Sequence, residues 1–120
     1  MIRRAYRCQT AVKSGCGVVQ GDNENTIKVG DGNFIGVYSF EGNEEKAKDD
    51  TVGIQLDEIP KVLAGGTVQA GKRAVLEADG SFIEMGTAAG KYNTCGVFLE
   101  SGVKGEYVDM LIDRDTITIA

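Results

Sequence analysis

The chain has 120 residues, with 13 Lys and Arg against 18 Asp and Glu, 17 Gly, one Pro, three Cys, and neither His nor Trp. This length predicts a single domain with one modest core, and glycine at about twice its average usage of ~7% predicts a turn-rich β protein. The lack of His excludes Ser-His-Asp and Cys-His catalysis and His-containing metal sites, and the net charge of −5 argues against a nucleic-acid binder with a broad basic face.

The charge is distributed unevenly along the chain. Arg3, Arg4 and Arg7 give the first seven residues a charge of +3, so residues 8–120 keep 13 minus 3, or 10, basic side chains against 18 acidic ones, a net of −8. No apolar run of roughly 7 to 15 residues follows these arginines, as a signal peptide requires, and no stretch is long enough for a transmembrane helix. We therefore expect a soluble protein that is not exported and has neither a membrane nor a nucleic-acid partner.

The chain is predicted to begin with an extended N-terminal arm, residues 1–10, which leads into a first strand around residues 4–12. The rest, residues 11–120, is predicted to be a single β domain, because short apolar or alternating runs are separated by Gly, Asn and Asp. Further strands are predicted at residues 16–20, 26–29, 34–40, 51–56, 67–69, 73–77, 82–85, 92–99, 106–112 and 116–119.

Two segments between these strands have a different composition. Residues 41–50 contain no large apolar side chain, so we expect a mobile polar hairpin loop there. Residues 59–63, with Pro60 near their start, are predicted to be a connection that accommodates a helical turn. No segment keeps an apolar period of roughly 3.6 residues, so helix should be minor. The expected fold is all-β, a small β-barrel or β-sandwich built of hairpins, with the N-terminal arm extended from it.

A short sequence pattern occurs twice. Residues 35–42 resemble residues 95–102, and each copy is followed by a loop and a strand of the form V-x-[IM]-x-[LI]-D, at residues 52–57 and 108–113. An isolated hairpin is only marginally stable in water, so the two hairpins should pack together or belong to one small barrel. Convergence of two hairpins on a common pattern explains the similarity equally well.

The sequence offers little catalytic or metal-binding equipment. Cys8, Cys16 and Cys95 are odd in number and lack C-x-x-C spacing, so we expect reduced, mostly buried thiols. The run Asp22-Asn23-Glu24-Asn25 is the nearest approach to a calcium loop, but it lacks the D-x-D-x-D-G spacing, so solvated turns are expected. We predict no enzymatic activity, no metal site and no cofactor.

The turn at residues 65–72 supports an alternative function. Its segment Gly66-Thr67-Val68-Gln69-Ala70-Gly71 is similar to the G-x-V-x-x-G turn of biotinyl and lipoyl carrier domains. Those domains present a modifiable lysine, commonly within Met-Lys-Met, and this chain has no such tripeptide. The second hypothesis is therefore a small β-barrel carrier or ligand-binding domain that uses this turn, with Lys72 as the residue to be modified.

The arm carries the candidate binding site. Its three arginines are suited to bidentate pairing with carboxylates on another chain, while the interleaved apolar side chains pack into a groove. Arg and Tyr are also enriched among interface anchors. A frayed terminus that only adds solubility is the alternative. We predict that five residues contact a large partner protein: Ile2, Arg3, Arg4, Tyr6 and Arg7.

The order of turns and strands from residue 59 to residue 112 resembles the small capsid cement, or head decoration, proteins of tailed bacteriophages. In that family a V-x-A-G turn precedes an A-D-G turn, then a G-[VI]-x-L-E-x-[GA] strand and a closing G-[ED]-x-V-x-V-x-[LI]. The first half of the chain matches loosely, and residues 41–50 and the arginine-rich start depart from the pattern. The matching positions are Val68, Ala70, Gly71 and Val75; Ala78, Asp79 and Gly80; Cys95, Gly96, Val97, Leu99, Glu100 and Gly102; and Gly105, Glu106, Val108, Met110 and Ile112.

This resemblance implies a compact β-barrel without catalytic residues that binds the outside of an assembled head where major capsid subunits meet, often as a trimer. On that basis we expect a structural virion protein on the outer capsid surface, made in the host cytoplasm, with the major capsid protein as its partner and a homotrimeric state. Its expected action is to stabilise the capsid, because a ligand that binds only the assembled lattice stabilises it by mass action.

Overall fold

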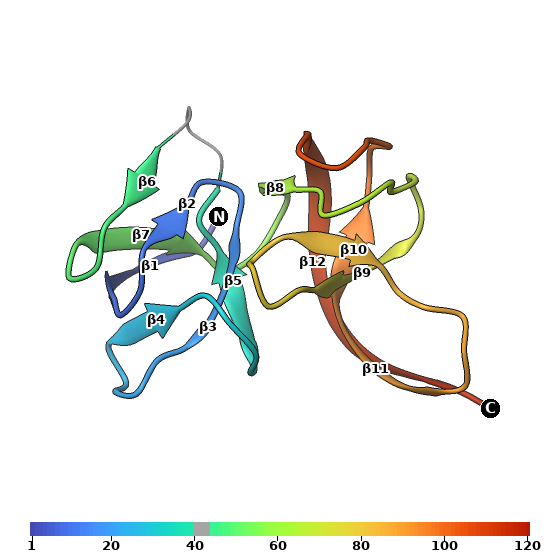
Figure 1. Cartoon of the computed structure of the whole chain (residues 1–120), viewed down its shortest axis with the longest axis horizontal. Coiled ribbons are helices and arrows are strands. Elements are labelled where there is room, and N and C mark those ends of the chain that lie inside the picture. The colour runs from blue at the N-terminus through green and yellow to red at the C-terminus, as the bar shows by residue number, and fades with distance from the viewer. Residues whose placement is uncertain (40–43) are drawn as a thin grey trace.

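The computed structural model describes residues 1–39 and 44–120, and in that part of the chain it contains twelve β-strands and no helix. Figure 1 shows two lobes side by side, the first made of β1 to β7 and the second of β8 to β12. The all-β fold predicted from the sequence is therefore confirmed. The strands are β1 (Arg3–Cys8), β2 (Val12–Lys13), β3 (Gly17–Gln20), β4 (Thr26–Lys28), β5 (Phe34–Val37), β6 (Glu45–Lys46), β7 (Thr51–Gln55), β8 (Lys61–Leu63), β9 (Arg73–Leu76), β10 (Phe82–Glu84), β11 (Gly90–Phe98) and β12 (Tyr107–Ile119).

In the first lobe, five strands close into a barrel in the order β1-β4-β3-β5-β7. β1 completes the closure, because it pairs antiparallel with β7 along its length and parallel with β4 at its end. Its alternating side chains place Tyr6 and Cys8 in the core, where they are 5% and 0% exposed. Most of the segment expected to be an arm is thus a strand of the barrel, at residues 3–8.

The described part of the acidic segment 41–50 is also hydrogen-bonded to the first lobe. β6 pairs antiparallel with β2. Beyond it, Asp49 N donates to Cys8 O at 2.7 Å and Cys8 N donates to Asp50 O at 2.9 Å, so this segment lies along the end of β1. Phe40, predicted as the end of a strand, and residues 41–43 of the predicted loop lie outside the described residues.

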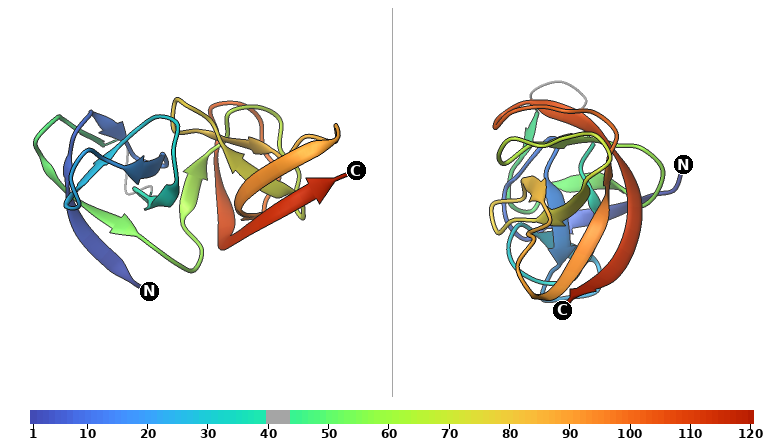
Figure 2. Two further views of the ribbon diagram at one scale, coloured as in Figure 1. Left: turned by 90° about the horizontal axis from the view of Figure 1, so that it is seen from below. Right: turned by 90° about the vertical axis from the view of Figure 1, so that its right-hand side faces the viewer.

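The second lobe is a five-stranded sheet in the order β10-β9-β11-β12-β8. Its two ends meet at one point, where a parallel bridge joins Ala64 to Phe82 and Gly65 N donates to Phe82 O at 2.8 Å. The sheet therefore rolls almost into a second barrel. Figure 2 shows the two lobes arranged end to end along the longest dimension of the molecule, which measures 41 Å.

Three sequence predictions about the second lobe were wrong. Residues 59–63 were expected to be a connection, but β8 begins directly after Pro60 and pairs with β12, an arrangement that Pro permits because it only precedes the strand. Residues 106–112 and 116–119 are one strand, β12, which continues through a β-bulge opposite residues 94–96. Residues 67–69 form only a single bridge, between Val68 and Gly102.

Each lobe has its own hydrophobic cluster, and the two clusters meet. The second-lobe cluster contains Phe82 and Phe98, both fully buried, and burying such a side chain contributes roughly 1.5–3 kcal/mol. Val37 of β5 belongs to this second cluster, and the ring of Phe34 lies edge-on to that of Phe82 with centroids 5.9 Å apart. Because β5 contributes to both lobes, they pack as one body.

The three cysteines are free and buried, as expected. Desolvation raises the pKa of each thiol, and that of Cys95 rises to about 12. The hairpins of the repeated sequence pattern fall in different lobes, one over β5 and β7 and the other over β11 and β12. Among the described residues there is no helix with the length and apolar character needed to cross a membrane.

Candidate functional site

The outer face of β1 presents a basic row, which we define as Arg3, Ala5 and Arg7. All three point away from the barrel core and are exposed. Their cross-strand partners on β7 carry no charge, and a Cβ added at Gly53, opposite Ala5, would meet no atom within 4 Å. The basic row is therefore a flat, open strip with a guanidinium group at each end.

Arg4 and Tyr6 point to the other side of β1. The guanidinium of Arg4 lies 4.8 Å from the centroid of the Tyr6 ring and donates to Tyr6 Oη and to Asn25 Oδ1, each at 3.3 Å. A cation–π contact of this kind contributes about 0.5–1 kcal/mol at an exposed site. Of the residues predicted to contact a partner, Tyr6 is thus part of the core and Arg4 covers the end of the barrel.

Ile2, also predicted as a contact residue, is held at the junction between the lobes. Its backbone N donates to Asp57 Oδ1 at 2.7 Å, and its carbonyl accepts from Leu56 N at 2.9 Å. The N-terminal amine lies 3.0 Å from Glu58 Oε1, and its hydrogen bond to Glu58 raises the pKa of the amine. These contacts fix Met1 and Ile2 beside the segment that enters β8.

Most of the exposed large apolar side chains belong to neighbouring segments: the N-terminus, the residues just before β8, the end of β11 and β12. Of the six such residues in the described part of the chain, five belong to these segments, with exposures from 39% to 61%, and only Val103 lies elsewhere, in the turn between β11 and β12. Together with the half-buried Val97 they form what we call the apolar stripe: Met1, Ile2, Ile59, Val97, Leu99 and Leu111.

Strand register explains why the apolar stripe is continuous across the second lobe. Leu111 is directly opposite Val97 in the β11–β12 pair. Met110 N donates to Pro60 O and Ile112 N donates to Glu58 O, which places Ile59 opposite Leu111 on the other side. On β12 the neighbours Val108 and Met110 point inward, so Leu111 has to point outward.

The charged groups beside the apolar stripe are paired within the chain. Lys61 Nζ lies 2.7 Å from Glu100 Oε1 and 3.2 Å from Asp109 Oδ1, and Arg73 pairs with Asp113 at 3.1 Å. The hydrogen bond from Lys61 lowers the pKa of Glu100, and the same bond raises the pKa of Lys61. A partner that covers the stripe therefore meets apolar atoms and compensated ion pairs.

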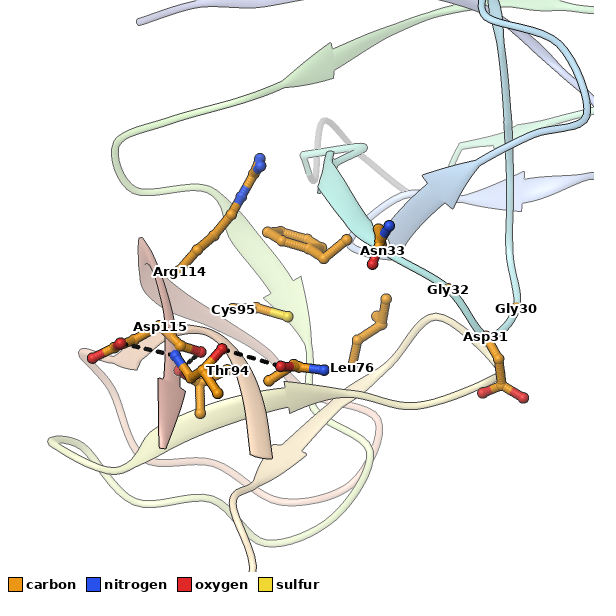
Figure 3. Close-up of a pocket in the computed structure, with 12 residues that line it drawn as sticks. Gly30, Asp31, Gly32, Asn33, Leu76, Thr94, Cys95, Arg114 and Asp115 are labelled. Carbon is orange, nitrogen blue, oxygen red and sulfur yellow. Dashed lines mark hydrogen bonds between the residues drawn. The ribbon is translucent and has the colours of Figure 1, made fainter. Parts of the chain in front are cut away.

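A cleft of about 540 Å³ lies between the lobes. One wall is the loop from Gly30 to Asn33, and the opposite wall is the β11–β12 pair around Thr94 and Asp115. Figure 3 shows Cys95 and Leu76 between these walls. The cleft is thus bounded by both lobes.

Arg114 is the cation of this cleft, and it is already engaged. The β-bulge between Thr94 and Gly96 changes the register of β11 against β12 near Arg114, and bulges commonly redirect a side chain in this way. The guanidinium donates to Ile35 O and lies 5.2 Å from the centroid of the Phe34 ring. Arg114 therefore ties β12 of the second lobe to β5 of the first.

The remaining features singled out in the sequence, the turn at residues 65–72 and the run at residues 22–25, are both turns in the structure. Within the turn at residues 65–72, Val68 is buried and Gly71 has a φ of 89°, a value that favours glycine, while Lys72 is exposed. The run from residue 22 to residue 25 is a turn in which Thr26 Oγ1 donates to Asn23 O at 2.8 Å. Across residues 1–39 and 44–120, no group of three or more Cys, Asp or Glu side chains is placed to hold a metal ion.

Sequence reasoning did not identify the apolar stripe or the cleft. The sequence does contain a signal for part of the stripe. Side chains of a strand at residues 107–112 point alternately to its two faces, so Leu111 lies on the face opposite to that of Val108 and Met110. The cleft had none, since it depends on a bulge and on the packing of two lobes.

The sequence matches no family model and no curated protein. Among solved structures, the chain is similar to the crystal structure of the head fiber gp8.5 N base in bacteriophage phi29, with a TM-score of 0.66 and 15% sequence identity over 97% of each chain. Because the alignment covers nearly the whole of both chains, it includes both lobes. What this chain and the phage head fiber base share at this level of identity is their fold.

Proposed function

We propose that this protein is a structural component of a phage head, which binds the outer surface of the assembled capsid between major capsid subunits and stabilises it without catalysis. The observation that carries the proposal is the fold likeness to the N base of a phage head fiber over 97% of both chains. The resemblance of residues 59–112 to capsid cement proteins, seen in turns and strands, supports the same class.

The apolar stripe is the proposed docking surface. Contiguous exposed apolar side chains on a soluble protein mark interaction sites, and each Å² of apolar surface removed from water contributes about 25 cal/mol. The stripe runs from the N-terminus to β11, so it can cover a junction between two capsid subunits. Ile2 keeps the contact role predicted for it, and Tyr6 is left out because it is buried.

The basic row supplies the charged part of the proposed contact. Arg7 projects from a flat strip, so a carboxylate on the capsid surface can approach its guanidinium bidentately. Stabilisation then follows from mass action, since a ligand at 100 times its Kd adds about 2.7 kcal/mol to the state that it binds. We propose a homotrimer, the state that the resemblance to capsid cement proteins implies. Linked copies would also bind the lattice with a higher effective concentration than a single copy.

The test is co-sedimentation with purified expanded heads that lack the protein. The double variant Ile59→Asn, Leu111→Asn replaces two exposed side chains of the apolar stripe, so it should fold normally and bind at least about tenfold more weakly. The matched control is Val103→Asn, which changes an equally exposed apolar residue, 53% exposed, outside the stripe. The control should bind like the wild type.

Two outcomes contradict the proposal at different levels. Undiminished sedimentation of the folded double variant removes the apolar stripe from the contact. A wild-type protein that stays in the supernatant with expanded heads overturns the capsid-binding function itself. Light scattering of the free protein tests the trimer independently, because its mass is compared with multiples of 12.8 kDa.

A further inference from the structure

We propose that the cleft between the lobes binds a neutral carbohydrate, one or two hexose units of a glycan. The cleft volume of about 540 Å³ lies within the range of roughly 300–1,000 Å³ for small-molecule sites. The surface of a hexose combines hydroxyl groups with patches of C–H, so it needs hydrogen-bonding walls and an apolar floor. The cleft has both.

The wall on the first lobe is a glycine-rich loop with available backbone groups. Gly30 and Gly32 have φ values of 151° and 147°, which side chains disfavour. Within residues 1–39 and 44–120, no hydrogen bond uses a backbone group of Gly30, Asp31 or Gly32. The loop therefore presents N–H and C=O groups that no side chain covers, together with the exposed amide of Asn33, which both donates and accepts.

The wall on the second lobe is arranged by its own hydrogen bonds. Thr116 Oγ1 donates to Asn93 Oδ1 at 3.2 Å, and Thr116 N donates to Asp115 Oδ1 at 2.8 Å. These bonds orient the Asn93 amide so that its N–H₂ group remains available as a donor, and they leave the second carboxylate oxygen of Asp115 as an acceptor. Donors and acceptors thus occur on both walls, as vicinal hydroxyl groups require.

The charges in the cleft select against ionic ligands. Arg114, the cation among the lining residues, is engaged with Ile35 O and the Phe34 ring, while Asp31 and Asp115 contribute negative charge. An anion such as phosphate or a uronic acid would therefore be repelled. A metal cation is disfavoured as well, because the described lining residues provide too few carboxylates at one point.

The floor is apolar. Leu76 and Phe34 are half-buried and Cys95 is buried, and all three line the cleft. Burial raises the pKa of the Cys95 thiol to about 12, so that side chain is uncharged at neutral pH. A sugar ring seated here covers carbon and sulfur atoms with its C–H face while its hydroxyl groups reach the two walls.

The test is saturation-transfer NMR and titration calorimetry on the full chain, with maltose, cellobiose and N,N′-diacetylchitobiose as neutral probes and glucuronic acid as the anionic one. At least one neutral disaccharide should bind, and glucuronic acid should not. The double variant Asn33→Ala, Asn93→Ala removes one exposed amide from each wall and should weaken binding by about tenfold or more. Asn23→Ala, an exposed asparagine outside the cleft, is the matched control and should bind normally.

A pull-down with a neutral polysaccharide such as dextran distinguishes a cleft that binds a polysaccharide chain from one that binds only free sugars. Retention of the protein on the polymer indicates that the cleft is open at its ends. The proposal is overturned if no neutral sugar binds the wild type, if the double variant binds as well as the control, or if glucuronic acid binds better than the neutral probes. Sedimentation of the double variant with heads should be unchanged, so failure of the sugar site leaves the capsid proposal intact.

Discussion

Gly96 lies so close to Leu111 that a Cβ atom at position 96 would overlap the Leu111 carbonyl oxygen. Gly36 has the same relationship with Gln55 in the first lobe. The registers also agree, since Val97 is opposite Leu111 and Val37 is opposite Gln55. In the repeated sequence pattern Gly36 corresponds to Gly96 and Gln55 corresponds to Leu111. The hairpins of the two lobes therefore share this close contact between a glycine and the opposite backbone.

Gly96→Ala and Gly36→Ala should each destabilise the protein by about 1–3 kcal/mol, because the new methyl group meets backbone that cannot move aside. Gly53→Ala is the control, since a Cβ there meets open space and the residue has no positive φ. That variant should be neutral or more stable by up to about 1 kcal/mol. Urea unfolding measures all three, and equal stability of Gly96→Ala and Gly53→Ala would contradict the steric explanation.

Arg114→Ala should weaken the attachment of the lobes, because it removes both the hydrogen bond to Ile35 O and the stacking on Phe34. We expect a loss of about 1–2 kcal/mol in the free energy of unfolding. Arg73→Ala instead removes an ion pair with the Asp113 carboxylate and an exposed hydrogen bond to the Asp113 carbonyl, both within the second lobe, and should cost about 1 kcal/mol or less. Calorimetry compares the two, and a smaller loss for Arg114→Ala than for Arg73→Ala would argue against the bridging role.

Stability should fall as the pH rises above about 9, and Cys95 should account for part of the slope. The folded protein holds the thiol proton to a pKa of about 12, whereas the unfolded chain releases it near the ordinary value of 9.0. Between these values the unfolded state binds fewer protons, so the free energy of unfolding decreases by up to about 1.4 kcal/mol per pH unit. Cys95→Ala should show a shallower slope from pH 9 to 10.5, and identical slopes would refute the assignment.

Head binding should depend only weakly on salt. The ion pairs beside the apolar stripe are satisfied within the chain, and apolar contacts are not screened. Only the basic row should respond when NaCl rises from about 50 to 500 mM, a change that shortens the screening length several-fold. Arg7→Gln should remove much of that remaining dependence in sedimentation assays. A steep salt dependence that Arg7→Gln leaves intact would place the main contact elsewhere.

Local sequence patterns were sufficient to predict strands that are bounded by turn residues. Strands were predicted at residues 34–40 and 51–56, and the structure has β5 at Phe34–Val37 and β7 at Thr51–Gln55, so both strands were found but the first is shorter than predicted. β1 was harder to interpret, because three arginines near a terminus resemble a solvated arm and its partner β7 lies more than 40 residues away in the sequence. A pairing over that separation leaves no local signature.

The candidate site, like the fold, could be predicted from the sequence only in part. The outward position of Leu111 can be read from the alternation of residues 107–112, so this member of the apolar stripe was available from the sequence. Its continuation to Ile59 and Ile2 depends on β8 and on the fixed N-terminus, which no spacing indicates. The position of Arg114 depends on the bulge near residue 95, where the register changes without any Gly or Pro at Arg114 to mark it.

The closure of the first barrel by β1 sets an order of events during synthesis. β1 is synthesised before residues 51–55, so its antiparallel edge stays uncovered until those residues leave the ribosome. Once that segment emerges, the first lobe can assemble, well before β11 and β12 exist. The second lobe then packs against a surface that has already formed, because Val37 and Phe34 of β5 belong to the first lobe and pack with Phe82 of the second. A nascent chain halted after residues 51–55 have left the ribosome should therefore already resist a protease at β1.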